Sequence, residues 1–312
     1  MLRHLIPSLL ALPLAASMAR AQEPVQAPVL RTADSLMRTG QVFRAESLFY
    51  LAVRRSPRDP DARLALGRYL AARGALKVGA VLMEEARFFG GDAAQVAREI
   101  APVYLRMHDF RALSMLPASP LEAPERARVE WLRGTPPSHL GPDSVVVPLR
   151  SGEALGEVTL TIGGESVEAV IDPGVRGILL DTLWRRRPGV KVFGSGRGAV
   201  AVVPTVKMGG LTLTNMAANF GLVGGPRRAR IGLDVLGAFM PTFDAAAGRL
   251  TLRRGGRLPA RGERVPTLVL PTGTWLVRRG SVIPLGSEAG RALTGEMPWT
   301  LDARRGEIVV GR

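Results

Sequence analysis

The sequence predicts an α+β protein of two parts, in which N-terminal helical hairpins precede an all-β C-terminal part. Up to about residue 113, apolar residues recur at helical spacing, as in Leu82, Ala86 and Phe89. After Ser144 the pattern changes to short β-branched runs that are separated by glycine turns. Six prolines interrupt the chain between Pro117 and Pro142, which favours a domain boundary there.

The composition is typical of a globular protein, with 46% hydrophobic and 22% charged residues in a chain of 312. The net charge is +15, but nearly all of it is scattered arginine without interleaved aromatic residues. We therefore expect no nucleic-acid partner. The chain lacks cysteine, and its three histidines lie in no cluster with metal-ligand spacing. We expect no disulfide, no metal and no other cofactor.

The first 21 residues have the pattern of a cleaved secretory signal peptide. Arg3 and His4 precede an apolar run from Leu5 to Ala16, and Ala19-Arg20-Ala21 provides a small-residue cleavage site near Ala21. We therefore expect a periplasmic or secreted protein. No later stretch approaches the roughly 20 apolar residues of a spanning helix, so we expect no membrane span after the signal is removed.

Residues 29–116 contain an internal repeat with a period of 34 residues. It pairs small residues, which let two antiparallel helices approach closely, and larger apolar residues, which fill the gap between the helices. The pairs include Ala33 with Gly67, Leu36 with Leu70, Gly40 with Gly74, Ala45 with Gly79, Phe49 with Met83 and Ala52 with Ala86. Ala101, Tyr104 and His108 continue the series as a partial third copy.

This period and these small residues resemble the tetratricopeptide (TPR) repeat, which implies a surface for protein contact. The alternative is a generic alanine-rich helical hairpin. Residues 117–144 then form a proline-rich linker with one short helix around 125–133.

The β part begins with residues 145–254, whose predicted strands are 145–148, 158–162, 167–171, 200–203 and 211–213. Gly163-Gly164 predicts a hairpin turn. Three segments follow in order. VTLTIGGESVEAVIDPGVRGILL carries an apolar strand into Asp172-Pro173-Gly174, GSGRG precedes VAVVPTVKMGGLTLTNMAANFGLV, and ARIGLDVLGAFMPTFDAAAGRLTLRR places Gly232 before a short helix and a hairpin.

Together these segments resemble one lobe of a bacterial retropepsin-like aspartic protease. The resemblance implies a β barrel with Asp172 as the catalytic residue and Pro173 and Gly174 in the active-site turn. It also implies a flap at Gly194, Gly196 and Gly198. Because one lobe supplies one aspartate, an active enzyme would be a homodimer that shares one proton between two Asp172 carboxylates and cleaves peptides or proteins.

The sequence departs from that family at the turn itself. Pro173 replaces the Thr or Ser whose hydroxyl braces the two turns, and proline has no N–H to donate. Arg176 stands where the family usually has a small residue, and a guanidinium that reached the carboxylate would oppose the shared-proton state. The alternative function is therefore a catalytically inactive module that binds an extended peptide, with the helical repeats as a second contact surface.

Residues 255–312 allow two interpretations. A shift of 58 residues lays Thr242 over Thr300, Asp244 over Asp302 and Gly248 over Gly306, so the tail repeats the hairpin that closes the lobe. Upstream, Pro271-Thr272-Gly273-Thr274 resembles an Asp-Thr-Gly-Thr turn with proline in place of the aspartate. The segment is either a β-hairpin extension or a degenerate second lobe, which would place a turn without a carboxylate opposite Asp172.

Overall fold

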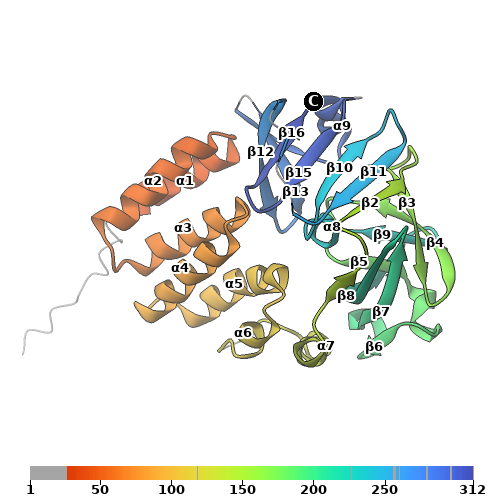
Figure 1. The fold of residues 1–312 in the computed structure, drawn as a ribbon. Helices are drawn as coiled ribbons and strands as arrows, with labels where there is room; N and C mark the ends of the chain where they lie inside the picture. Colours follow the sequence, from red (N-terminus) through yellow and green to blue (C-terminus); the bar gives the residue numbers. More distant parts are fainter. Residues whose placement is uncertain are drawn as a thin grey trace, which may run out of the picture.

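The computed structural model describes residues 27–117, 119–225, 227–255, 258–259, 261–278, 280–295 and 297–311. The predicted signal peptide lies outside these residues. The predicted order of helical hairpins followed by an all-β barrel is confirmed (Figure 1). The helices are α1 (Ala27–Arg38), α2 (Val42–Arg55), α3 (Pro60–Ala72), α4 (Leu76–Phe88), α5 (Ala93–Met107), α6 (Phe110–Ser114) and α7 (Ala123–Gly134).

The helical part is built from similar hairpins, because α1 packs on α2 and α3 packs on α4. The paired small residues allow this contact: a Cβ added to Gly67 would lie only 2.8 Å from the carbonyl oxygen of Gly79. Gly40 and Gly74 turn the chain with φ values of 76° and 90°, a region that favours glycine. His108 takes the equivalent place after α5 with a φ of 55°. The third copy therefore keeps the turn conformation without its glycine.

The strands and short helices of the β part alternate along the chain. They are β1 (Ser138–Leu140), β2 (Ser144–Pro148), β3 (Glu157–Ile162), β4 (Glu165–Ile171), β5 (Ile178–Asp181), β6 (Lys191–Phe193), β7 (Val200–Met208), β8 (Leu211–Gly221), β9 (Arg228–Ile231), α8 (Leu233–Leu236), β10 (Met240–Asp244), β11 (Arg249–Arg253), β12 (Glu263–Leu270), β13 (Gly273–Arg278), β14 (Ser281–Pro284), α9 (Glu288–Thr294), β15 (Trp299–Asp302) and β16 (Glu307–Val310).

The first of two sheets closes into a barrel. Its neighbours run β8-β5-β9-β4-β3-β7, and β7 also pairs with β8, so the ring has no free edge between these strands. The side chains inside are apolar and fully buried, as Leu160, Ile171 and Ile178 show. The β3–β4 hairpin turns at Gly163 and Gly164, both with positive φ, as the sequence predicts.

The second sheet joins the two ends of the β part in the order β14-β13-β12-β16-β15-β10-β11-β2. At its centre β10 and β15 pair antiparallel with Thr242 opposite Thr300, and the two hydroxyl oxygens lie 2.8 Å apart. Thr242 and Thr300, which correspond under the 58-residue shift, are thus direct cross-strand partners. The hairpins β10–β11 and β15–β16 are consequently related by a local two-fold axis between these threonines.

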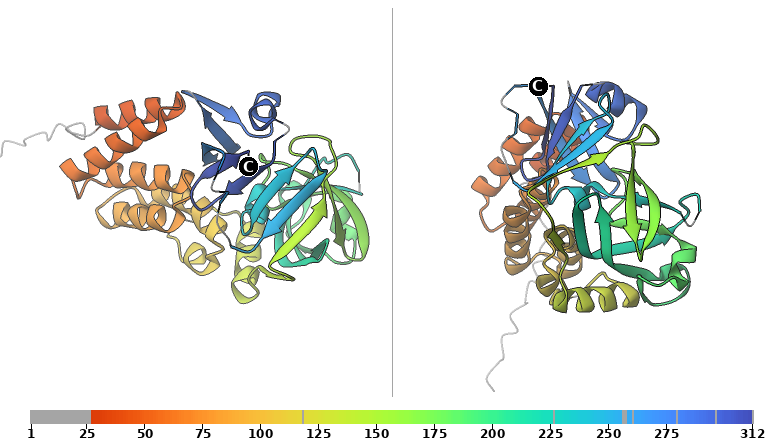
Figure 2. Two further views of the ribbon diagram at one scale, coloured as in Figure 1. Left: turned by 45° about the horizontal axis from the view of Figure 1, so that its top comes forward. Right: turned by 45° about the vertical axis from the view of Figure 1, so that its right-hand side comes forward.

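The helical and β parts are packed together (Figure 2). Arg73, at the end of α3, donates from Nη1 to the carbonyl oxygens of Thr267 and Gly306 at 2.8 Å and 2.6 Å. The segment expected as a linker contains α7, which packs on β6 and β7. Its Arg128 is buried and donates to the carbonyl oxygen of Ala218 at 2.8 Å. This contact holds α7 against the barrel.

Candidate active site

Asp172 follows β4 directly, and the barrel fixes its backbone. Its N–H donates to the carbonyl oxygen of Ile231 on β9 at 3.0 Å, which continues the parallel pairing of β4 with β9. Its Oδ1 accepts a hydrogen bond of 2.8 Å from the N–H of Gly174. The carboxylate is therefore held by its own turn, as an aspartate at the end of a strand commonly is.

The second carboxylate oxygen of Asp172 forms an ion pair with Arg230. The distance from Nη1 of Arg230 to Oδ2 is 2.7 Å, and Nη2 of the same guanidinium lies 2.8 Å from Oε2 of Glu153. The hydrogen bond to Asp172 raises the pKa of Arg230. Both oxygens of Asp172 thus have a donor within the chain.

The cation that pairs with Asp172 is Arg230, whereas the sequence indicates Arg176 as the arginine near this turn. Arg176 makes no hydrogen bond or ion pair with any residue that the structure describes, and its charge acts on Arg106 and Asp234 instead. In the parallel pairing of β4 with β9, Arg230 lies beside Val170. Asp172 follows Val170 by two residues, so it lies on the same side of the sheet and within reach of the guanidinium. In the sequence, Arg230 could have been noticed because it lies two residues before Gly232, in the strand that leads to the predicted short helix.

The turn of residues 271–274 lies against the Asp172 turn. The N–H of Thr274 donates to the carbonyl oxygen of Pro173 at 3.1 Å. A Cβ on Gly273, whose φ is 128°, would lie 2.7 Å from that same oxygen, and a Cβ on Gly174 would lie 3.9 Å from the carbonyl oxygen of Thr272. The two turns thus approach each other at Gly174 and Gly273.

When Gly273 is aligned with Gly174, Pro271 falls at the position that corresponds to Asp172. The facing turn therefore brings no carboxylate. Residues 145–254 and residues 255–312 of the β part thus do not form between them the shared-proton pair of an aspartic protease. The turn at 271–274 therefore already covers the Pro173 side of the Asp172 turn.

The predicted flap glycines lie between β6 and β7. A Cβ on Gly194, whose φ is 75°, would lie 2.5 Å from Cγ of Pro124 on α7. A Cβ on Gly196 or Gly198 would meet nothing within 4 Å. Next to them, Phe193 packs against Trp131 of α7 with ring centroids 6.3 Å apart. The base of this loop is thus attached to a helix that precedes the barrel.

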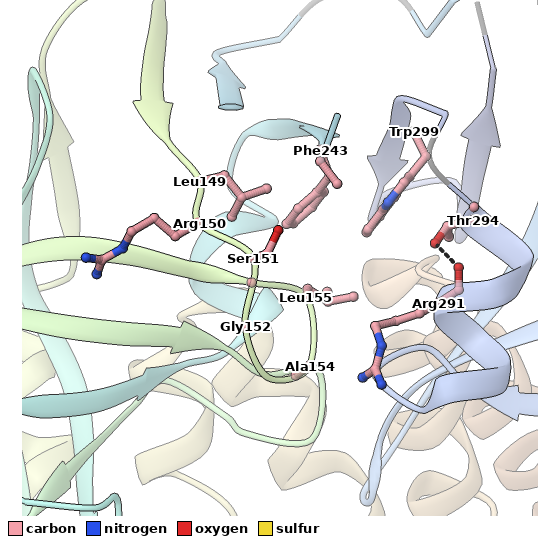
Figure 3. Close-up of a pocket in the computed structure, with 13 residues that line it drawn as sticks. Leu149, Arg150, Ser151, Gly152, Ala154, Leu155, Phe243, Arg291, Thr294 and Trp299 are labelled. Atoms are coloured by element: carbon pink, nitrogen blue, oxygen red, sulfur yellow. Dashed lines mark hydrogen bonds between the residues drawn. The ribbon is translucent and has the colours of Figure 1, made fainter. Parts of the chain in front are cut away.

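A cavity of about 170 Å³ lies between the β2–β3 connection and the second half of the β part (Figure 3). Its walls include Ser151 and Leu155 on one side and Arg291 of α9 on the other, with the stacked rings of Phe243 and Trp299 4.2 Å apart. Gly286 lies between this cavity and the Asp172 turn. A Cβ at Gly286 would lie 3.1 Å from Cδ of Pro173 in the turn and 3.6 Å from Cβ of Ala154 in the cavity wall.

The described residues contain no group of three His, Cys, Asp or Glu side chains that could hold a metal ion. Within the same residues, no helix combines the length and the apolar character needed to cross a membrane.

No protein-family model matches the sequence, and no curated protein matches it. Among solved structures, the chain is similar to a retropepsin-like aspartic protease from Rickettsia conorii, with 18% identity and a TM-score of 0.27. The match covers 37% of this chain and 93% of that chain.

Proposed function

We propose that this protein is a single-chain, catalytically inactive relative of retropepsin-like aspartic proteases that binds an extended peptide or protein segment. The observation that carries the proposal is the turn at 271–274, which lies against the Asp172 turn and supplies no carboxylate. A lone aspartate cannot divide the roles of acid and base between two carboxyl groups.

The surroundings of Asp172 support the same proposal. Arg230 and the N–H of Gly174 occupy its two oxygens, so a catalytic water would have to compete with donors that are already in place. A homodimeric protease would additionally require the chain's own second half to leave the Asp172 turn. The cavity beside the turns combines apolar walls with Arg291, a lining that suits a peptide with an apolar side chain.

The test has a catalytic arm and a binding arm. The mature protein and Asp172→Asn are incubated with a peptide library from acidic to neutral pH, and neither is expected to produce cleavage. Cleavage that disappears in Asp172→Asn would overturn the proposal. Solution mass is measured in parallel, and a monomer is expected.

For binding, a display library of random linear peptides is selected on the mature protein, and enriched sequences are measured by calorimetry. Ser151→Trp, at an exposed position of the cavity wall, should abolish binding. Ser166→Trp, at an exposed position of β4 outside the cavity, is the matched control and should bind as the parent does. A library that yields no specific binder, or binders indifferent to Ser151→Trp, contradicts the proposed peptide site.

We also propose that the chain is exported to the periplasm or the medium and that its helical hairpins are TPR-like repeats serving protein contact. The support is the signal-peptide pattern of residues 1–21 and the 34-residue period. N-terminal sequencing of the protein from a cell fractionation should find a new N-terminus near Gln22. An uncleaved protein in the cytoplasm would contradict export.

A further inference from the structure

A second cavity, of about 230 Å³, lies where the helical part meets the barrel. Its walls come from α5, α6 and α7 on one side and from β8, α8 and the chain just beyond Asp172 on the other. Its lining includes Leu105, Arg106, His108, Arg176, Met216 and Asp234. Neither the fold resemblance nor the proposed peptide site uses this cavity.

The charged side chains of the cavity fall into two groups. The guanidinium of Arg128 already has partners in the protein, because it pairs with Glu125 at 2.6 Å and donates to two acceptors on β8. Arg106 and Arg176 form the other group. Arg106 donates from Nη1 to the carbonyl oxygen of Ala71 at 2.9 Å, and Arg176 has no hydrogen bond or ion pair within the described part of the chain. Two guanidiniums thus share a cavity without a carboxylate bound to either.

These two cations are close enough to affect each other. Loss of solvation, followed by repulsion from Arg176, lowers the pKa of Arg106 to about 10. A positive charge that is both desolvated and near a like charge is a costly arrangement. An anion placed between the two guanidiniums would offset that cost and would use their free donors, which form a fork suited to carboxylate oxygens.

Asp234 is the anion of the protein that lies near this pair. Asp234 lines the cavity, and the protein around its carboxylate removes solvation and raises its pKa. Its oxygens accept from the N–H groups of Gly177 and Val235 at 2.9–3.0 Å. Because a carboxylate already sits in the cavity, a ligand with a single negative charge is favoured over a dianion.

His108 lies at the same cavity and has an unusual backbone. It occupies the repeat position that Gly40 and Gly74 hold in the first two hairpins, and it keeps their left-handed conformation with a φ of 55°. A side chain in that conformation costs free energy, and such residues cluster at functional sites. Its ring stacks on Phe110 with centroids 5.9 Å apart, which places an imidazole where a repeat turn would ordinarily have no side chain.

From these observations we propose that the cavity between the helical part and the barrel binds a small monocarboxylate with an apolar group. Arg176 and Arg106 hold the carboxylate, and Leu105, Phe110 and Met216 contact the apolar group. The volume is below the ~300–1,000 Å³ of sites for drug-sized ligands, so the ligand is small. This site is independent of whether the protein binds peptides or cleaves them.

The probe is benzoate, titrated by calorimetry and by thermal unfolding into the full mature protein at constant ionic strength. We expect saturable binding and a raised melting temperature. Benzamide tests the need for the negative charge, acetate the need for the apolar group, and inorganic phosphate the preference for a monoanion. Each should bind at least about tenfold more weakly than benzoate. Equal or tighter binding of phosphate would overturn the proposed ligand class, and absence of benzoate binding would overturn the site.

Variants separate the site from nonspecific charge. Arg176→Gln should weaken benzoate binding about tenfold or more with little change in stability, since it removes no hydrogen bond or ion pair with the described residues and its repulsion of Arg106 offsets its attraction to Asp234. Arg176→Lys should retain part of the affinity. Arg197→Gln, an exposed arginine between β6 and β7, is the matched control and should bind as the parent does. Equal losses in the Arg176 and Arg197 variants would mean that benzoate responds only to net charge.

His108→Gly gives a separate readout, because glycine relaxes the left-handed turn while removing the imidazole. We expect this variant to be more thermostable, and to bind benzoate more weakly because the cavity loses an imidazole ring from its lining. Full affinity in this variant would contradict a contact between His108 and the ligand.

Discussion

Thr274 donates its backbone N–H to the carbonyl oxygen of Pro173 at 3.1 Å, and this bond joins the two halves of the β part at the Asp172 turn. The acceptor belongs to the residue that replaces the expected Thr or Ser. Proline offers no hydroxyl or N–H, but its carbonyl oxygen remains available. The turns are therefore joined through the backbone of this chain instead of through a pair of hydroxyls.

The close approach of the two turns predicts a strong effect of Gly273→Ala. A Cβ at this residue would lie 2.7 Å from the oxygen of Pro173, at a φ of 128°. We expect the free energy of unfolding in urea to fall by roughly 2 kcal/mol or more. Gly225→Ala is the control, because its φ is 121° with nothing within 4 Å of the added Cβ. If both variants lose the same amount, backbone strain alone explains the effect and the contact between the turns contributes nothing.

The ion pair of Arg230 and Asp172 predicts measurable coupling. Their side chains are 30% and 21% exposed, so the pair is only partly screened by water. A double-mutant cycle of Asp172→Asn and Arg230→Gln, followed by urea unfolding, should give a coupling energy of about 1 kcal/mol that falls with added salt. A coupling energy of zero at low salt would show that the pair does not stabilise the turn.

The docking of the helices predicts that Arg73→Met destabilises the whole chain. Its guanidinium donates to the carbonyl oxygens of Thr267 and Gly306, and charged hydrogen bonds of this kind contribute about 1.5–3 kcal/mol. We expect a loss of about 2 kcal/mol in urea unfolding and earlier unfolding of the helices than of the barrel. Arg55→Met, on the exposed end of α2, should change the stability by less than about 0.5 kcal/mol.

Tyr69 predicts a loss of stability at alkaline pH. Burial, then the charge of Glu46, raises its pKa above the ordinary value of 10.0, and its hydroxyl donates to the carbonyl oxygen of Val42 or to Glu46, both 3.1 Å away. Above pH 10 the unfolded chain releases this proton while the folded chain keeps it, so stability falls as the pH rises.

The measurement is urea unfolding at a series of pH values from 9 to 11.5, compared with Tyr69→Phe. The parent should lose stability more steeply than the variant, by up to about 1.4 kcal/mol per pH unit. Tyr104, whose pKa is also raised by burial, contributes a similar slope to both proteins and cancels in the comparison. Parallel curves would mean that Tyr69 ionises in the folded protein as it does in the unfolded chain.

Patterns between near neighbours in the sequence were sufficient to predict the helices and strands. The spacing of Gly40, Gly74, Gly67 and Gly79 predicts helical hairpins, because turns need positive φ and close helices need small residues. The alternation before Asp172 predicts a strand that ends in a turn. The equivalence of Thr242 and Thr300 could be read from the 58-residue shift, although the shift alone did not show that these residues face each other.

The helical hairpins, the β part and the strand that ends at Asp172 could all be predicted from the sequence, since they depend on periodicity and on turn chemistry between near neighbours. The tertiary structure decided what surrounds Asp172. Arg230 lies 58 positions away along the chain and Thr274 farther still, and both reach the turn through strand register and the local two-fold axis. Those are set by the packing of whole sheets. The sequence offered the turn with Pro271 as one of two interpretations, and only the packing showed that this turn lies against Asp172.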